Sequence, residues 1–181
     1  MKPLKIAILA SGRGTVIPSI IDAIKSEIEI IISNRPNAPV LKLAKNYNIK
    51  ARYISSEKSI SKTLKQNHID LILLIGYMRI LSAKFISDWE NKILNVHPSL
   101  LPAYAGLINL AVHRAVIAAG DKETGCTVHL VTNNLDAGPI LVQKRCPVKT
   151  TDTPETLKAR VQKLEGKVFV EAIKTWREEY A

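Results

Sequence analysis

The sequence has few of the features that mark membrane, secreted or metal-binding proteins. It has two cysteines, Cys126 and Cys146, in a spacing that matches no zinc motif. No apolar run approaches the ~18 residues needed to span a bilayer, and the N-terminus lacks the pattern of a secretory signal peptide. Aromatic residues make up only 5% of the chain, which disfavours a stacking surface for nucleic acid bases. We therefore expect a cytoplasmic protein with no metal and no membrane partner.

Positive charge is what the sequence has in excess. Lys and Arg outnumber Asp and Glu by 26 to 16, for a formal charge of +10. This excess favours anionic partners, which include phosphorylated metabolites, polyglutamates and nucleic acid. Since the Lys and Arg residues form no clustered run, we expect small anions as ligands and no specific nucleic acid. With 181 residues, the chain is long enough for one domain, 1–181, with a full hydrophobic core.

Short apolar runs alternate with helical patterns through roughly the first hundred residues. Strands are predicted at 5–10, 29–33, 50–54, 70–75 and 92–96, and helices from about Thr15 and at 40–48, 57–67 and 82–91. The run 70–75 (DLILLI) is continuously apolar, as a central parallel strand covered on both faces would be. This alternation predicts right-handed βαβ units and a doubly wound α/β sheet.

The pattern changes after the predicted helix at 110–119. Two strands are predicted at 124–131 and 139–148, and the loop between them is short enough for an antiparallel pair. Thr153 is a good N-cap and Pro154 suits the first position of a last helix that continues to about Glu179.

Asn95 and His97 are the most informative polar residues. They stand two positions apart at the end of a predicted strand, so their side chains share a face. Pro98 favours an extended backbone at His97, and ligands of open α/β sheets bind beyond the carboxyl ends of the strands. Asp136, in the loop 132–138, is either an ordinary turn residue or a carboxylate that faces His97 and favours its charged form.

Two loops at the same edge of the predicted sheet are further candidate ligand-binding segments. The turn 11–15 joins a strand to a helix and could cradle a phosphate with backbone amides, or could be a tight turn only. The segment 76–81 follows the central strand and by the same rule lies near Asn95, unless it is an ordinary connection. His129 alternates with two apolar neighbours and is interpreted as structural.

Three motifs in this order resemble the formyltransferases that use 10-formyltetrahydrofolate: 78–81 (MRIL), 95–102 (NVHPSLLP) and 135–139 (LDAGP). The resemblance covers essentially the whole chain. It implies a seven-stranded, mostly parallel sheet with helices on both faces and an antiparallel pair near the C-terminal end. It is strongest to members that formylate the amine of glycinamide ribonucleotide in purine biosynthesis, so it implies two small-molecule substrates, one of them the formyl folate, and no metal.

Matched position by position, the resemblance also implies roles for individual residues. The catalytic residues are Asn95, His97 and Asp136; the folate-binding residues are Met78, Arg79, Ile80, Leu81 and Asn95; the residues that bind glycinamide ribonucleotide are Gly12, Gly14, Thr15, Val16 and Glu165. The amine attacks the formyl carbon directly, Asn95 and His97 hold the oxyanion, and Asp136 supports His97 and proton transfer.

The sequence departs from the family pattern at three places. Val16 stands where Asn is usual, and Ile108 stands where many relatives have His. Many relatives have an arginine in the helix after the third strand. This sequence has no clear counterpart of it, and Glu57 and Lys58 are the nearest candidates.

Two other functions remain open from the sequence. Methionyl-tRNA formyltransferase and formyltetrahydrofolate hydrolase share this core but carry a further domain, for which we expect no room in this chain. The other alternative is a basic nucleic-acid-binding module with a Rossmann-like shell. The sequence leaves the oligomeric state undecided between monomer and dimer.

Overall fold

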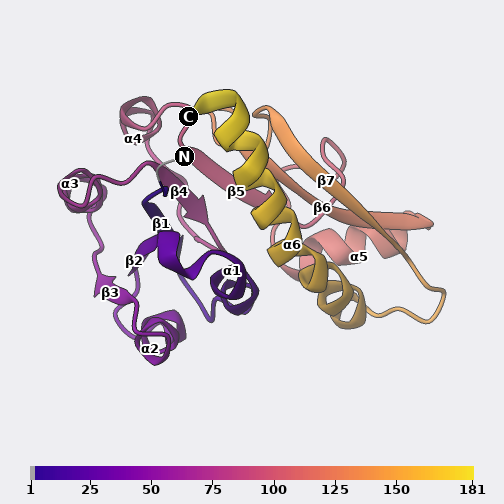
Figure 1. The fold of residues 1–181 in the computed structure, drawn as a ribbon. Coiled ribbons are helices and arrows are strands. Elements are labelled where there is room, and N and C mark those ends of the chain that lie inside the picture. The colour runs from indigo at the N-terminus through magenta and orange to yellow at the C-terminus, as the bar shows by residue number, and fades with distance from the viewer. Residues whose placement is uncertain (1–2) are drawn as a thin grey trace. The chain divides into compact units, whose positions relative to one another are not determined.

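Seven strands form one sheet in the order β3-β2-β1-β4-β5-β6-β7 (Figure 1). The computed structural model describes residues 3–181. The strands are β1 (Ile6–Ala10), β2 (Ile28–Ser33), β3 (Lys50–Tyr53), β4 (Leu71–Leu74), β5 (Ile93–His97), β6 (Glu123–Leu130) and β7 (Ile140–Pro147). The pairs β1–β2, β1–β4, β2–β3 and β4–β5 are parallel, and β6–β7 is antiparallel. The predicted fold class is confirmed.

The chain divides into two compact units, Met1–Asn95 and Val96–Ala181. The single domain predicted for 1–181 stays a prediction, and residues 1 and 2 lie outside the described part. Among residues 3–181, no helix is both long and apolar enough to cross a membrane.

The first unit is doubly wound. Helices α1 (Ile17–Ile24) and α2 (Pro39–Asn46) cover one face of its strands, while α3 (Glu57–Gln66) and α4 (Ala83–Asp88) cover the other (Figure 1). Every residue of β1 and β4 is buried. This two-sided burial explains why both strands are continuously apolar rather than alternating.

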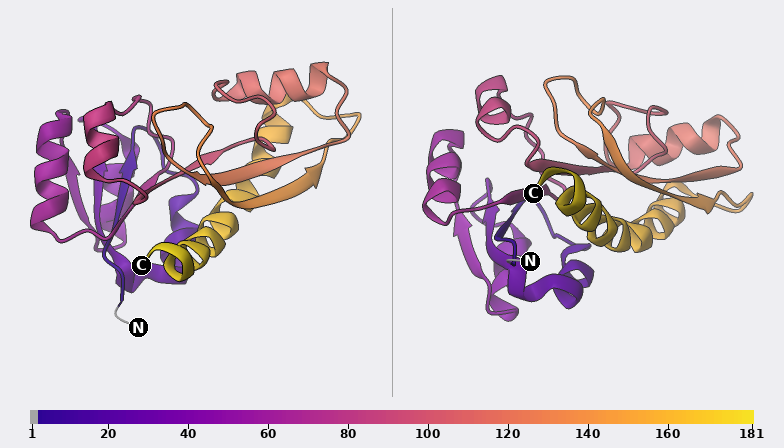
Figure 2. Two further views of the ribbon diagram at one scale, coloured as in Figure 1. Left: turned by 90° about the horizontal axis from the view of Figure 1, so that it is seen from above. Right: turned by 45° about the horizontal axis from the view of Figure 1, so that its top comes forward.

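The second unit is built on the β6–β7 hairpin. Helix α6 (Pro154–Tyr180) packs along both strands of the hairpin and contacts α5 (Leu110–Ala118), as Figure 2 shows from two sides. Thr153 and Thr156 form a reciprocal capping box that begins α6, so the predicted N-cap is confirmed. Gly125 lets β7 approach closely, because a Cβ there would lie 1.8 Å from the Lys144 carbonyl oxygen.

The predicted elements are all present, and the differences lie at their ends. Helix α1 begins at Ile17 rather than about Thr15, because Gly14 has a φ of +65° and the Ile17 amide closes a turn onto the Gly14 carbonyl. Helix α4 ends at Asp88 rather than at 91, since Asn91 adopts a positive φ of 57° and turns the chain into β5. Local backbone geometry therefore sets both helix ends.

Candidate active site

His97 ends β5 and is 4% exposed. Its Nδ1 lies 3.2 Å from Asp136 Oδ2, and its Nε2 lies 3.0 Å from the backbone carbonyl oxygen of Tyr104. An imidazole can donate from both nitrogens only when it carries two protons. The surroundings of His97, a carboxylate on one side and a carbonyl on the other, therefore suit the imidazolium form.

Asp136 is surrounded by hydrogen-bond donors. Its side chain is 8% exposed, Oδ2 accepts a hydrogen bond of 2.9 Å from the Gly106 amide, and Oδ1 lies 3.6 Å from His129 Nε2. Burial alone would raise the pKa of Asp136, but hydrogen bonds from His129, His97 and Gly106 hold that pKa well below its ordinary value. Asp136 is therefore a buried anion, and the predicted pairing with His97 is present.

The loop that carries Asp136 is shaped by its backbone. Asp136 has a φ of +52°, in the left-handed region that Asp tolerates better than most residues. Two residues later, a Cβ on Gly138 would lie 1.8 Å from the Leu130 carbonyl oxygen. The close return of this loop onto the end of β6 turns the carboxylate of Asp136 back towards the histidines.

His129 contacts the candidate site, which its position in the sequence does not indicate. The alternation with apolar residues in β6 predicts a structural role, which stays a prediction, and the structure adds that Nε2 faces Asp136 while Nδ1 lies 2.9 Å from the Leu130 carbonyl oxygen. The sequence signal for this contact is the place of His129 one residue from the end of β6, directly before the Asp136 loop.

The segment 98–109, between β5 and α5, has a fixed base and an exposed tip. Thr127 Oγ1 donates to the Ser99 carbonyl at 2.7 Å and accepts from the Leu101 amide at 3.1 Å. At the tip, Ile108 is 60% exposed. Ile108 thus adds an apolar side chain where many relatives are expected to have a histidine.

Glu165 and His113 are buried ionisable groups of the same unit. Burial raises the pKa of Glu165 to about 7, against the opposing effect of Lys158. Burial, followed by the charges of Lys158 and His97, lowers the pKa of His113 to about 4. At neutral pH His113 is therefore uncharged, whereas Glu165 divides between its acid and its carboxylate.

In the first unit, Ser11 joins the two predicted binding segments. Its hydroxyl donates to Asn34 Oδ1 at 2.6 Å and accepts from the Met78 amide at 2.8 Å. The turn after β1 and the segment after β4 are thus held together at the carboxyl ends of their strands.

The turn 12–16 offers backbone groups rather than side chains. Gly14 packs closely, because a Cβ there would lie 2.6 Å from Ile17 Cδ1. Val16 takes the N-cap position of α1, gives no side-chain hydrogen bond and is 5% exposed. Val16 therefore gives α1 no side-chain cap, but the Ile17 amide already donates to the Gly14 carbonyl and Pro18 has no N–H, so the first two residues of α1 offer no amide to an anion. The Val16 side chain belongs to the core.

The segment 78–81 presents an apolar surface. Ile80 is 82% and Met78 44% exposed, whereas Leu81 is buried. The Arg79 guanidinium donates to the Ser55 carbonyl, which fixes the segment beside the start of α3. Asn95, on β5, pairs in register with Leu74 of β4. Between residues 3 and 181, no three His, Cys, Asp or Glu side chains gather as a metal ion would require.

Comparison with known proteins identifies the family to which the chain belongs. A family model described as formyl transferase matches residues 4–173. The chain belongs to the formyl transferase family. It is 38% identical to the phosphoribosylglycinamide formyltransferase of Haemophilus influenzae, over 96% of this chain and 87% of that protein.

Other formyl transferase relatives differ in length. The trifunctional purine biosynthetic protein adenosine-3 of Gallus gallus is 39% identical over 94% of this chain, but this chain spans only 18% of its length. Among solved structures, phosphoribosylglycinamide formyltransferase from Anaplasma phagocytophilum superposes with a TM-score of 0.90 at 37% identity, covering 96% of this chain and 86% of that one. The resemblance of the three motifs to this family is confirmed.

Proposed function

We propose that this protein transfers a formyl group from 10-formyltetrahydrofolate to the amine of glycinamide ribonucleotide. The observation that carries the proposal is the buried pair of His97 and Asp136, in a chain of the formyl transferase family. Relatives named for this activity match most of the chain, which supports the same reaction here. The reaction belongs to purine biosynthesis, and a cytoplasmic location stays a prediction.

Glycinamide ribonucleotide would be bound through its phosphate and its amine. The phosphate would accept hydrogen bonds from backbone amides in the turn formed by Gly12, Gly14, Thr15 and Val16. The amine would meet Glu165. Because the pKa of Glu165 is raised to about 7, its carboxylate can accept a proton from the substrate ammonium near neutral pH. That transfer leaves the neutral amine that the attack requires.

The formyl folate would lie against Met78, Arg79, Ile80, Leu81 and Asn95. The exposed side chains of Met78 and Ile80 suit the face of a flat ring, and the backbone of the segment can bond to the ring edge. The hydrogen bond from the Met78 amide to Ser11 holds this backbone in place before the folate binds.

The chemical step needs donors for a developing oxyanion. Attack of the amine on the formyl carbon makes a C–N bond and places negative charge on the formyl oxygen. The Asn95 amide and the His97 imidazolium would donate to that oxygen, at roughly 2.7–4 kcal/mol of transition-state stabilisation per donor. The attacking nitrogen then loses a proton, which passes through water, with the help of Asp136, to the folate nitrogen. The tetrahedral intermediate collapses, the formyl carbonyl re-forms, and the bond from the formyl carbon to the protonated folate nitrogen breaks.

Tyr104 sets a condition on this step. Its carbonyl oxygen accepts from His97 Nε2 at 3.0 Å, while Nδ1 faces Asp136. For Nε2–H to reach the formyl oxygen, the substrate must take the place of the Tyr104 carbonyl. We therefore expect substrate binding to shift the backbone near Tyr104.

The direct test mixes the purified protein with glycinamide ribonucleotide and 10-formyltetrahydrofolate and measures formylated product. Parallel reactions replace the acceptor with methionyl-tRNA, or omit it and measure formate release. The proposal expects rapid transfer to the ribonucleotide alone. Transfer to the tRNA, or hydrolysis without acceptor, at a comparable rate would contradict it and identify one of the alternative reactions.

A further inference from the structure

The turn 104–107 bonds to both members of the His97–Asp136 pair. The Tyr104 carbonyl accepts from His97 Nε2 at 3.0 Å, and the Gly106 amide donates to Asp136 Oδ2 at 2.9 Å. The Leu107 amide closes the turn by donating to the same Tyr104 carbonyl at 3.3 Å. We call this arrangement the closed form. In the closed form the Tyr104 carbonyl takes the hydrogen bond that His97 would give to an oxyanion.

Tyr104 adopts a backbone conformation that a bulky side chain disfavours. Its φ is 62°, in the left-handed region that residues other than glycine seldom visit. A residue keeps such a conformation only where contacts elsewhere compensate for its cost. A contact of the Tyr104 side chain is therefore needed to explain why the turn stays closed.

That contact is made with Asp121. The Tyr104 hydroxyl donates to Asp121 Oδ2 at 2.6 Å, the short distance of a hydrogen bond to a charged acceptor. Because the protonated phenol makes this bond, the bond raises the pKa of Tyr104 above its ordinary value. The phenol therefore keeps its proton at neutral pH, and the hydrogen bond is maintained there.

Asp121 is a fixed anchor for the turn. It stands between α5 and β6, directly after Gly120, which has a φ of 71°. Its amide donates at 3.4 Å to the carbonyl of Val116, a buried residue of α5. A movement of the Tyr104 backbone away from His97 therefore stretches the bond to Asp121, since the aspartate does not follow.

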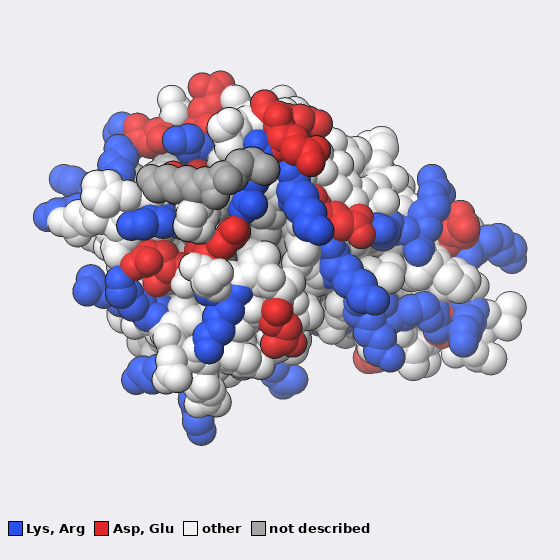
Figure 3. Space-filling model, in the orientation of Figure 1, with Lys and Arg blue, Asp and Glu red and all other residues white. Residues whose placement is uncertain are grey.

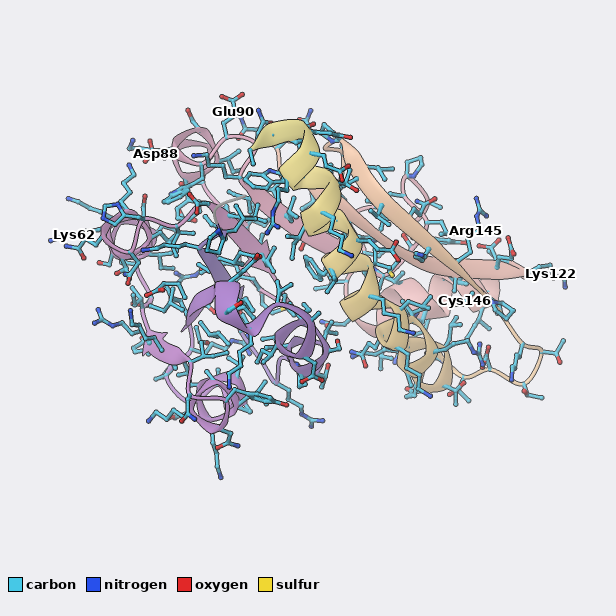
Figure 4. The ribbon with its side chains drawn as sticks, viewed as in Figure 1. Lys62, Asp88, Glu90, Lys122, Arg145 and Cys146 are labelled. Carbon is cyan, nitrogen blue, oxygen red and sulfur yellow. The ribbon has the colours of Figure 1, made fainter. Side chains whose placement is uncertain are left out.

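The Asp121 carboxylate has no competing cation. Figure 3 shows many Lys and Arg side chains along α6 of the same unit, and Figure 4 shows the next residue, Lys122, extending outward from the start of β6. Among residues 3–181, no ion pair involves Asp121. The carboxylate is thus committed to Tyr104.

We propose that Tyr104 and Asp121 are positioning residues that hold the ligand-free enzyme in the closed form, which the formyl folate must open in order to bind. The inference rests on the proposed function. When only a fraction of the molecules is open, the apparent affinity for a ligand is its intrinsic affinity multiplied by that fraction. The hydrogen bond between Tyr104 and Asp121 therefore raises the KM for the formyl folate and leaves kcat unchanged.

The kinetic test removes the hydroxyl and keeps the ring. Tyr104→Phe should lower the KM for 10-formyltetrahydrofolate about 5-fold, the size expected of one hydrogen bond, at the wild-type kcat. Asp121→Ala should have the same effect, and the double variant should add nothing, because both changes remove one interaction. Tyr180→Phe, at an exposed tyrosine of α6, is the matched control and should keep the wild-type KM.

The conservative variant Asp121→Asn keeps an acceptor for the Tyr104 hydroxyl without the charge. Its KM should lie between the two extremes, about 2-fold below the wild-type value. A purely structural role of the Tyr104–Asp121 bond would raise the KM or lower kcat when the bond is removed. The fall in KM at constant kcat therefore distinguishes the positioning role.

A second measurement needs no substrate. The Leu107 amide is bonded to the Tyr104 carbonyl in the closed form, so its hydrogen exchange in the ligand-free protein reports how often the turn opens. Exchange at Leu107 should be about 5-fold faster in Tyr104→Phe and unchanged in Tyr180→Phe.

The outcomes separate this proposal from the proposed function. An unchanged or raised KM in Tyr104→Phe, or exchange at Leu107 that does not accelerate, would overturn the role given to Tyr104 and Asp121 and leave the formyl transfer intact. Absence of formyl transfer by the wild-type protein would contradict the proposed function, while hydrogen exchange would still test whether the Tyr104–Asp121 bond keeps the turn closed.

Discussion

The two regions assigned to the reaction present different chemical groups. In the first unit, the turn 12–16 and the segment 78–81 offer backbone amides and exposed apolar side chains, fixed by Ser11. In the second unit, His97, His129 and Asp136 form a buried cluster of ionisable side chains. A backbone surface recognises a ligand by shape, whereas a buried charged cluster stabilises charge as it develops. Side-chain substitutions in the second unit should therefore lower mainly turnover. In the first unit, substitutions that change the backbone should have the larger effect on ligand recognition.

The largest effect is expected at His97. His97→Ala removes one oxyanion donor and should lower kcat at least ~100-fold, with a much smaller change in KM. Steady-state kinetics measure kcat and KM, and thermal unfolding measures the stability of the variant. His68→Asn is the matched control, because His68 is exposed and has a φ of 52° that Asn tolerates. Retention of most of the wild-type kcat in His97→Ala would remove His97 from the mechanism.

The second effect concerns Asp136 and pH. The pKa of Asp136 is depressed in the folded protein, so its contribution to stability is present above the unfolded value and is lost as the pH falls below about 5. Asp136→Asn should reduce kcat strongly and lower the free energy of unfolding by about 1–3 kcal/mol at pH 7. The difference in stability between variant and wild type should shrink towards pH 3.

Denaturant unfolding at several pH values checks this expectation. Glu165 has a raised pKa and acts with the opposite sign, since it favours the folded protein at lower pH. The comparison of variant and wild type at each pH cancels this contribution. A stability difference that does not change with pH would contradict the role given to the Asp136 carboxylate.

A third change tests the backbone surface. Gly14→Ala places a Cβ 2.6 Å from Ile17 Cδ1 at a φ of +65° and should cost about 1–2 kcal/mol of stability. It should also raise the KM for glycinamide ribonucleotide more than it changes kcat. At Gly12 a Cβ meets nothing within 4 Å, so the unfolding of Gly12→Ala is the control for stability. Equal destabilisation by both substitutions would argue against a strained turn at Gly14.

The smallest effect is expected at Val16. From the sequence alone, Asn at this position, as in the family pattern, would add a side-chain contact to the substrate. Val16 is 5% exposed in the structure, so Val16→Asn places an amide in the core and should cost about 1 kcal/mol or more in the free energy of unfolding. Differential scanning calorimetry measures this cost. Tighter substrate binding without loss of stability would show that the turn can present this side chain to the ligand.

Periodicity predicted the fold because each element carries its own signal. The continuous apolar run of β4 and the Thr153–Pro154 start of α6 are local features that the structure keeps. The pairing of His97 with Asp136 followed from the family motifs. The contact of His129 with Asp136 depends on how the 132–138 loop folds back, and the contact of Tyr104 with His97 depends on the path of 98–109. Neither path is encoded in a local pattern, so the sequence predicted neither contact.

The central claim is that His97 and Asp136 act as one catalytic unit. A double-variant cycle of His97→Ala, Asp136→Asn and their combination, measured as kcat for formyl transfer, tests this claim most directly. The account predicts that the double variant is much less impaired than the product of the two single losses, because part of the effect of Asp136 is exerted through His97. Losses that multiply independently in the double variant would contradict it.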